Sequence, residues 1–217
     1  TGVQTCLFRS ICPYPKDCAA GQRLKYEQYI SRWERQGYKV EISNFINNSL
    51  WKVIYKRGYI LKKIIGIFKG YSRRIRDIFS LRKYDLIYIH MWVTPIGTTF
   101  FERLFIFLSK KVIFDLEDNV FLKNYSINKD NPNPFAYLFK NSNKQIFLTK
   151  KTPPIFMELA PYLYRENGYS LADLINYISE LNYSFYSIFP LKKIQDVEFF
   201  CNSIKDGSSK NILLLKK

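Results

Sequence analysis

The run YDLIYIHM, residues 84–91, decides the fold together with KVIFDL, residues 111–116. Both runs are almost continuously apolar or aromatic, which is typical of strands buried on both faces of a sheet. Pro95 and Gly97 end the first run, and a helix is expected over about residues 98–109, before the second run begins. Strands and helices that alternate at these lengths predict an α/β fold with a mostly parallel, Rossmann-like sheet covered on both sides.

The segment before these strands has the same alternation. Residues 19–42 read AAGQRLKYEQYISRWERQGYKVEI after a sharp turn at CPYPKD. Apolar side chains between Leu24 and Trp33 recur at helical spacing, and Gly37 is placed as a helix stop. Residues 38–42 then alternate as a strand does. The segment predicts loop, helix, turn and strand, which is the second half of a β-α-β unit.

Residues 50–83 form a basic stretch with eleven Lys or Arg residues and one acid, Asp77. Its apolar residues recur in steps of three and four, so we expect an amphipathic helix with one apolar face. The basic residues that lie largely outside this face are Lys62, Lys63, Lys69, Arg73, Arg74 and Arg76.

The first ten residues, TGVQTCLFRS, have neither a clean strand alternation nor a helical period. They resemble the translation of a sequencing-library adapter joined to a genomic fragment. We interpret residues 1–10 as a non-native leader and leave them out of the functional argument. The alternative is a genuine short strand around Cys6 to Phe8.

After residue 124 the pattern is interrupted and then restarts. Residues 124–143 are rich in Asn and Pro and are expected to form a loop or linker. Residues 154–159 predict a strand, and Ser170 is expected to cap a helix that runs to about Leu181. Residues 184–189 and 212–215 predict two further strands, with a short helix over 197–203 between them. These strands either join the first sheet or form a second, small α/β unit.

Composition restricts the class of protein. Hydrophobic residues make up 47% of the chain and charged residues 24%, which excludes wholesale disorder. The net charge of +16 attracts polyanions without choosing among them. No apolar run reaches the length of a membrane span, and no signal peptide is visible. The four cysteines form no C-x-x-C pair, so we expect reduced thiols, no metal site and a cytoplasmic location.

Three motifs carry a resemblance to a known family. They are PYPKDCAAGQRLKYEQY (residues 13–29), YDLIYIHMWVTPIGTTFFERL (residues 84–104) and KVIFDLEDNVFL (residues 111–122). In this order and spacing, residues 11–145 resemble the N-terminal, acceptor-side domain of family 4 glycosyltransferases. That family has the GT-B fold of two facing Rossmann-like domains. The resemblance implies transfer of a sugar from a nucleotide-sugar donor to a saccharide or lipid-linked acceptor, as in the synthesis of cell-envelope polysaccharide.

The resemblance also implies a site at the carboxyl ends of the strands. Gly21, Gln22 and Arg23 would contact substrate from the loop after the first strand, and His90 would do so from the end of its own strand. Asp118 or Glu117 would bind acceptor hydroxyls or assist proton removal. Each residue also has an ordinary interpretation: a strand-to-helix turn, a histidine bonded to backbone, and carboxylates that cap the next turn.

Residues 146–217 resemble a different enzyme, the C-terminal end of an FkbM-type S-adenosylmethionine-dependent methyltransferase. The residues that carry this resemblance are PPIFMELAPYLYRENGYSLADLINYISELNYSFYSI and DGSSKNILLLKK. The glycine-rich cofactor loop of that fold has no counterpart upstream. A methyltransferase fragment is therefore the alternative function, and S-adenosylmethionine its cofactor.

Since the donor-binding domain of the glycosyltransferase family also has no counterpart, we expect this chain to bind no cofactor itself and to be inactive alone. Glu158 and Glu166 have the spacing of that family's donor-binding pair, but Pro161 lies between them. The methyltransferase-like segment accounts for both, and we do not assign them to a donor site.

The basic stretch suggests one partner. An amphipathic basic helix suits peripheral attachment to the inner face of an anionic membrane, where lipid-linked acceptors reside. The six basic residues named above would make this contact, and the alternative is a solvated basic face over a buried helix. Nucleic acid is not expected, because the basic residues accompany apolar periodicity and no known binding module is visible.

Overall fold

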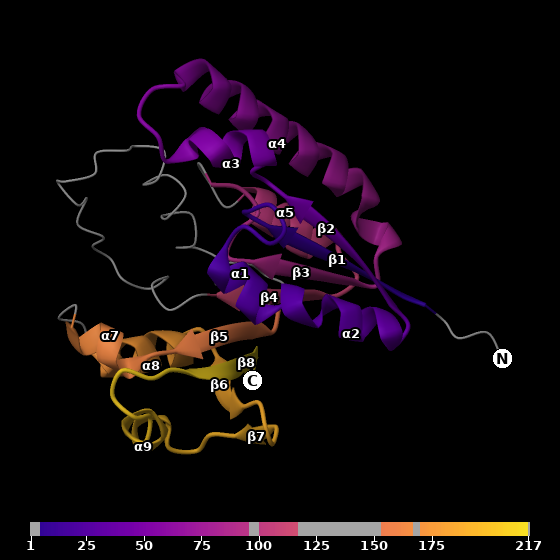
Figure 1. Cartoon of the computed structure of the whole chain (residues 1–217). Helices are drawn as coiled ribbons and strands as arrows, with labels where there is room; N and C mark the ends of the chain where they lie inside the picture. The colour runs from indigo at the N-terminus through magenta and orange to yellow at the C-terminus, as the bar shows by residue number, and fades with distance from the viewer. Residues whose placement is uncertain (1–4, 96–99, 117–152, 167–169, 217) are drawn as a thin grey trace. The chain divides into compact units, whose positions relative to one another are not determined.

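The computed structural model describes residues 5–95, 100–116, 153–166 and 170–216. The described residues divide into two compact units: 5–95 and 100–112 belong to unit 1, and 113–116, 153–166 and 170–216 belong to unit 2. Both units combine strands and helices (Figure 1), which confirms the α/β class. The expected linker at 124–143 lies outside the described residues.

The strands of unit 1 are parallel and lie in the order β2-β1-β3. They are β1 (Cys6–Cys12), β2 (Tyr38–Asn44) and β3 (Leu86–His90). β1 is paired along its whole length with β2, from Cys6 opposite Tyr38 to Cys12 opposite Asn44. On its other side Ile11 lies opposite Ile89 of β3, so the carboxyl ends of all three strands lie at one edge.

The first ten residues contribute to the sheet. Residues 6–10 form most of β1, the strand between β2 and β3, whereas their interpretation as a non-native leader stays a prediction. The alternative, a genuine strand around Cys6 to Phe8, describes the structure better. Alternation is weak because both faces of β1 are covered: Phe8 packs on Trp33, whereas Arg9 on the opposite face binds Asp77.

One face of this sheet is covered by α1 (Ala20–Lys25), the 3-10 turn η1 (Glu27–Tyr29) and α2 (Ile30–Arg35). Their core contains Tyr26 and Ile30 packed with Cys12. The sequence predicted one helix here, but Tyr26 leaves the helical conformation with φ −141° and splits it in two. Gly37 has φ 89°, the left-handed conformation that ends helices and favours glycine, so the expected stop is confirmed.

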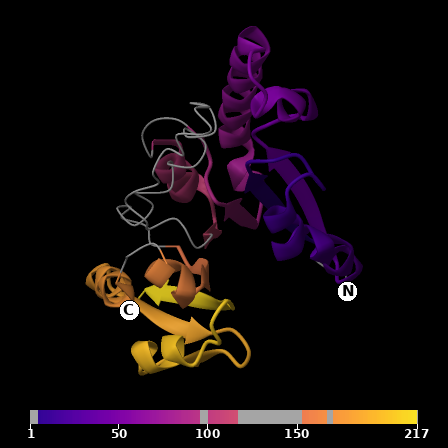
Figure 2. The same cartoon turned by 60° about the vertical axis from the view of Figure 1, so that its left-hand side comes forward.

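The other face is covered by α3 (Asn48–Ile54) and α4 (Ile60–Ser80), with α5 (Phe100–Leu108) beside α4. Figure 2 shows α4 along the outside of unit 1 with α3 next to it. The basic stretch was expected to contain one long helix. It contains two, because Gly58 and Tyr59 have φ 76° and 55° and turn the chain between them.

Helix α4 has much of its apolar side exposed, so the alternative of a solvated basic face over a buried helix does not describe it. Leu61, Phe68 and Phe79 are 70%, 69% and 85% exposed. The residues that face inward are Lys63, Gly66, Gly70, Arg74 and Asp77. The two glycines explain the packing, because a Cβ at Gly66 would lie 2.9 Å from Leu50 and one at Gly70 would lie 2.6 Å from the Phe45 ring. The backbone of α4 therefore approaches the layer beneath it closely.

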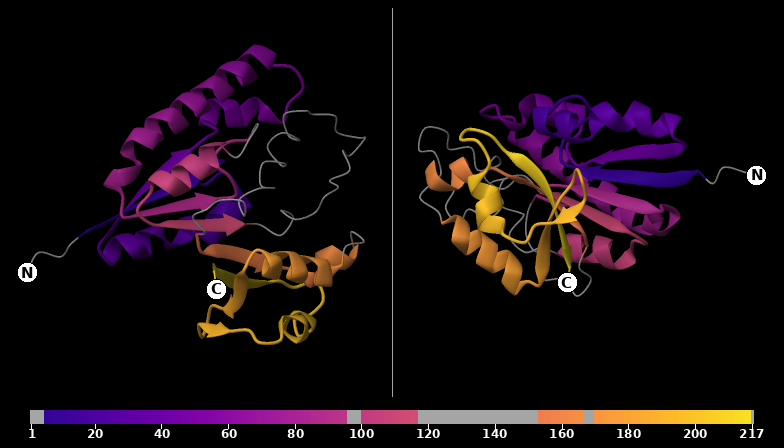
Figure 3. Two further views of the ribbon diagram at one scale, coloured as in Figure 1. Left: turned by 180° about the vertical axis from the view of Figure 1, so that it is seen from behind. Right: turned by 90° about the horizontal axis from the view of Figure 1, so that it is seen from below.

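Unit 2 contains β4 (Val112–Leu116, all but its first residue), β5 (Ile155–Leu159), β6 (Tyr183–Ser187), β7 (Lys192–Lys193) and β8 (Lys210–Lys216). Their order is β4-β5-β8-β6-β7. β4 and β5 are parallel, and β8 runs antiparallel to both of its neighbours, β5 and β6. The helices are α7 (Pro161–Glu166), α8 (Leu171–Glu180) and α9 (Val197–Asn202), drawn from two sides in Figure 3.

The elements predicted for unit 2 are confirmed, including the cap of α8, where the Ser170 hydroxyl accepts from the Asp173 N–H at 3.4 Å. Helix α7 was not predicted, because six residues that begin with Pro161 are too short to show a helical period. The antiparallel direction of β8 was not predicted either, since a strand pattern carries no direction.

Replacing Gly70 by alanine tests the close packing of α4. The new Cβ meets the rigid, buried ring of Phe45, and overpacking of this kind costs about 1–3 kcal/mol. Alanine is the better helix former, so a gain in stability would show that no such contact exists. We expect urea denaturation to show a lower free energy of unfolding for Gly70→Ala. Ser72→Ala, at an exposed position of the same helix, should change it little.

Candidate functional site

The candidate site is the edge of unit 1 where β1, β2 and β3 end. After β2 the chain stays beside the end of β1, since the N–H of Phe45 donates to the Cys12 carbonyl and that of Ile46 to the Pro13 carbonyl, both at 2.8 Å. The loop from β1 to α1, the end of β3 and the start of α3 therefore share this edge. In parallel α/β sheets this is the edge where ligands bind.

Gln22 and Glu27 hold the loop between β1 and α1. The amide of Gln22 donates to the Tyr14 carbonyl at 3.0 Å and to Glu27 at 2.5 Å, and it accepts from the Tyr14 N–H at 3.3 Å. The second oxygen of Glu27 accepts from the Asp17 N–H at 2.9 Å. Gln22 is almost fully buried. It was predicted to bind substrate, but the bonds of its amide give it a positioning role within the loop.

The other residues predicted for this loop are more accessible. Arg23 is exposed in α1, and Gly21 is half-buried. No described side chain caps the first turn of α1, whose N-cap residue is Ala19. Arg23 is therefore the one of the three predicted loop residues that offers a charged, solvent-exposed side chain.

His90, the last residue of β3, is fully buried. Its ring packs edge-on against Tyr26, with 5.8 Å between centroids. The next residue, Met91, has φ 61°, and the Trp92 N–H donates back to the His90 carbonyl at 2.8 Å. This tight three-residue turn is strained for a non-glycine residue, and such strain concentrates at functional sites. His90 therefore lies buried beneath the surface of the candidate site, at the end of β3.

Cys12 ends β1 at the same edge but is not a nucleophile. Its thiol contacts the Ser43 carbonyl at 3.8 Å and is fully buried. Burial raises the pKa of Cys12 to about 11, so the thiol is protonated near neutral pH.

Arg74 of α4 holds the ends of all three strands. Its guanidinium donates to the carbonyl of Cys12 at 2.9 Å, to that of Ser43 at 3.1 Å and to that of Val93 at 2.7 Å. Cys12 ends β1, Ser43 lies one residue before the end of β2, and Val93 follows β3. Arg74 is completely buried, and this burial lowers its pKa while the charge of Asp77 opposes the shift.

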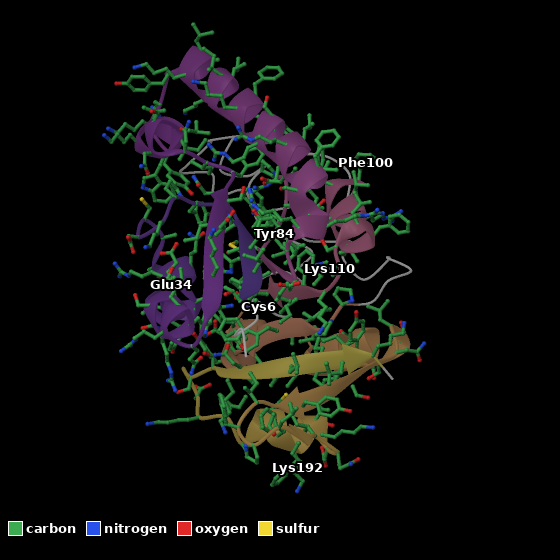
Figure 4. The ribbon with its side chains drawn as sticks, turned by 90° about the vertical axis from the view of Figure 1, so that its right-hand side faces the viewer. Cys6, Glu34, Tyr84, Phe100, Lys110 and Lys192 are labelled. Atoms are coloured by element: carbon green, nitrogen blue, oxygen red, sulfur yellow. The ribbon has the colours of Figure 1, made fainter. Side chains whose placement is uncertain are left out.

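Asp77 neutralises Arg74 and connects it to Arg9 of β1. Its carboxylate accepts from Arg74 at 3.0 Å, from the Ser43 hydroxyl at 2.6 Å and from Arg9 at 2.5 Å. Arg9 in turn contacts Tyr84, whose hydroxyl donates to Glu41 at 2.5 Å. Figure 4 shows Tyr84 between α4 and the strands. We refer to Arg9, Ser43, Arg74 and Asp77 as the arginine network.

Glu102 of α5 is a buried carboxylate behind the end of β3. One of its oxygens accepts from the N–H groups of Val93 and Thr94, each at 3.0 Å. Burial raises the pKa of Glu102, and the bonds from Thr94, Glu102 and Val93 N–H groups partly oppose this. Glu102 and Arg74 therefore hold the same short segment, one through its amides and the other through the Val93 carbonyl.

The structure describes only some of the acidic residues that the sequence singled out. Glu117 and Asp118 lie outside the described residues, so their catalytic roles stay predictions. Asp115, in the same acidic cluster, is fully buried in β4. Glu158 lies within β5 and accepts from the Ser209 hydroxyl at 2.5 Å, which fits the decision not to assign it to a donor site.

Of the six basic residues expected to contact a membrane, some are buried and others are exposed. Lys63 is buried and donates to the Lys56 carbonyl at 2.5 Å, and Arg74 belongs to the arginine network. These two residues do not face outward, which corrects the expected set. Arg73 is half-buried, whereas Lys62, Lys69 and Arg76 are exposed.

The structural roles of Arg74, Asp77, Glu27 and Glu102 were not predicted from the sequence. A signal for Glu102 was present, because it interrupts the apolar run of residues 100–108. A signal for the pair on α4 was the single acid of the basic stretch, placed three residues after an arginine.

Comparison with known proteins finds no matching family model and no matching curated protein. Among the described residues, no helix is long and apolar enough to cross a bilayer. In the same part of the chain, no group of three or more His, Cys, Asp or Glu side chains is arranged to hold a metal ion.

Replacing Arg74 by methionine tests the arginine network. The variant breaks the buried ion pair of Arg74 with Asp77 and removes the arginine's bonds to the carbonyls of Cys12, Ser43 and Val93. Breaking a buried pair costs about 3–5 kcal/mol. We expect a loss of this size in the free energy of unfolding. The control is Arg76→Met, an exposed arginine of the same helix, which should change stability by less than about 0.5 kcal/mol. Equal stability of the two variants would contradict the role of Arg74.

Glu102→Gln tests the buried carboxyl through pH. Because burial raises the pKa of Glu102 above the ordinary value of a glutamate, the folded protein holds the proton more tightly than the unfolded chain. Its contribution to stability is therefore largest at low pH and falls as pH rises through the folded-state pKa. Glutamine keeps an oxygen that can accept both N–H bonds but does not ionise. Measured from about pH 4 to about pH 8, the variant should gain stability relative to the wild type, whereas a constant difference would refute the shift.

Proposed function

We propose that unit 1 is the acceptor-side domain of a glycosyltransferase, which positions a saccharide or lipid-linked acceptor for transfer from a nucleotide-sugar donor. The observation that carries this proposal is the shared carboxyl edge of β1, β2 and β3. Two of the three motifs behind the resemblance, residues 13–29 and 84–104, supply the β1–α1 loop and the end of β3 at that edge.

The chemistry of the edge is compatible with binding and orienting a polar acceptor. Arg23 offers a solvated cation for a phosphate or hydroxyl group. The loop beneath it is held by Gln22 and Glu27, and the segment after β3 by Arg74 and Glu102. Rigid support of this kind limits the entropy lost when a ligand is oriented. Asp118 or Glu117 is proposed to assist removal of the acceptor proton, and the donor is proposed to bind to a second domain of the family's fold.

The second candidate, a methyltransferase, is favoured by one feature of unit 2. β8 is inserted antiparallel between β5 and β6, which run parallel to each other. The resemblance assigns these elements to the last strands and helix of the methyltransferase fold. The glycine-rich loop that would hold S-adenosylmethionine has no counterpart in the sequence, so sugar transfer is the better supported function.

Ligand titration of the whole chain by calorimetry tests the proposal. The acceptor probes are a short-chain prenyl diphosphate sugar and free oligosaccharides, with UDP-glucose and S-adenosylmethionine as the other arms. We expect an acceptor probe to bind saturably and Arg23→Ala to weaken it about tenfold, which is about 1.4 kcal/mol. Arg32→Ala, also exposed but in α2, should have no effect.

We expect no measurable affinity for UDP-glucose, because the donor belongs to the second domain. Tight binding of UDP-glucose would contradict the acceptor-side assignment. Binding of S-adenosylmethionine would support the second candidate instead. Failure of every acceptor probe to bind would remove the proposal.

A further inference from the structure

Helix α4 carries an apolar ridge that no described part of the chain covers. Leu61, Ile64, Phe68, Ile75 and Phe79 are all exposed, from 40% at Ile64 to 85% at Phe79. At 100° per residue these positions lie within about 60° of the helix circumference, along almost all of its 21 residues. Scattered exposed apolar residues are ordinary, but a continuous ridge marks an interaction surface.

The flank of α4 beside this ridge is basic. Lys62, Lys69, Arg73 and Arg76 also fall within about 60° of one another, on the side next to α3. α4 thus has three faces: one packed on the sheet, one apolar and outward, and one basic. Helices that lie in the surface of an anionic bilayer combine an apolar face with Lys and Arg beside it.

The basic flank borders a cavity between α3 and α4. Its volume is about 400 Å³, and the residues that line it include Asn47, Ser49, Lys52, Lys62, Ile65 and Lys69. No lining residue given by the described structure is acidic. Three lysines around one cavity favour a phosphate group, and Ile65 belongs to both the cavity and the exposed side of α4.

We propose that the outer surface of α3 and α4 docks on an anionic membrane, with the ridge inserted among the acyl chains and a phospholipid headgroup phosphate bound in the cavity. The ridge alone would suit a protein partner or a second copy of the chain. The lysine cavity and the basic flank favour the membrane, because they complement the negative charge of its headgroups. This inference does not depend on the sugar-transfer proposal.

Flotation with lipid vesicles tests the docking. The vesicles are phosphatidylcholine with phosphatidylglycerol, compared with phosphatidylcholine alone. We expect binding to the anionic vesicles and a loss of about tenfold in Phe68→Ser, since Phe68 is 69% exposed and its loss removes insertion area. Phe199→Ser is the matched control, because Phe199 is equally exposed at 73% but lies in α9 of unit 2. No binding to anionic vesicles would overturn the proposal.

A second pair of variants distinguishes phosphate binding in the cavity from a general effect of positive charge on vesicle binding. Lys62→Gln/Lys69→Gln removes two charges from the cavity, and Arg57→Gln/Arg76→Gln removes two exposed charges of the same stretch outside it. We expect the first variant to weaken anionic-vesicle binding about tenfold more than the second. Equal losses would overturn the headgroup cavity. Circular dichroism would confirm that all variants are folded.

Two further measurements address other occupants. Calorimetry with inorganic phosphate alone should show no saturable binding, and saturable binding sensitive to Lys62→Gln/Lys69→Gln would overturn the assignment to lipid. Ultracentrifugation should show that Phe68→Ser leaves the oligomeric state unchanged. A dimer that this variant dissociates, without vesicle binding by the wild type, would assign the ridge to a second copy.

Discussion

The fold of unit 1 depends on one buried arginine. The peptide carbonyls at the ends of parallel strands have no further strand residues to bond, and inside a covered sheet they have no water either. Arg74 supplies donors to three such carbonyls at once, from a helix that crosses the ends of the strands. Its charge is tolerated because Asp77 lies 3.0 Å away and is itself held by Ser43 and Arg9. Removing either partner leaves a buried charge, so the group acts as one unit.

The arginine network also explains why α4 presents its apolar side to solvent. A helix can place only one face on the sheet, and here that face contains Arg74 and Asp77 together with Gly66 and Gly70. The glycines bring the backbone close enough for the short Asp77 side chain to reach Ser43 at 2.6 Å. Ile67 and Tyr71 of α4 still pack against the core. The exposed apolar residues of the helix take no part in that core, so a role at the surface is the simplest explanation of their regular spacing.

The exposure of the apolar side of α4 marks the limit of what the sequence alone could predict. The runs at residues 84–91 and 111–116 predicted β3 and β4 because a strand buried on both faces has an unambiguous pattern. Most elements of unit 2 were also predicted from clear local patterns; the exceptions are the short α7 and β7. Periodicity located α4 and its apolar side correctly but left open what that side faces, since it measures which residues lie together and not what they contact. β1 was left out because Arg9 and Ser10 break its apolar run, and only the tertiary partners of Arg9 explain its presence in a strand.

The candidate site and the proposed membrane surface meet at one edge of unit 1. β2 ends at Asn44, and Asn47, which caps α3 through the Leu50 N–H at 2.8 Å, already lines the lysine cavity. The chain between them is bonded to the end of β1, where the loop carrying Arg23 begins. A lipid-linked acceptor has its polar part joined to a membrane anchor, so a protein that binds it must place its site close to the bilayer surface. With both features at the same edge, docking through α4 would bring the ends of β1 and β3 to the depth at which such an acceptor presents its phosphate and sugar.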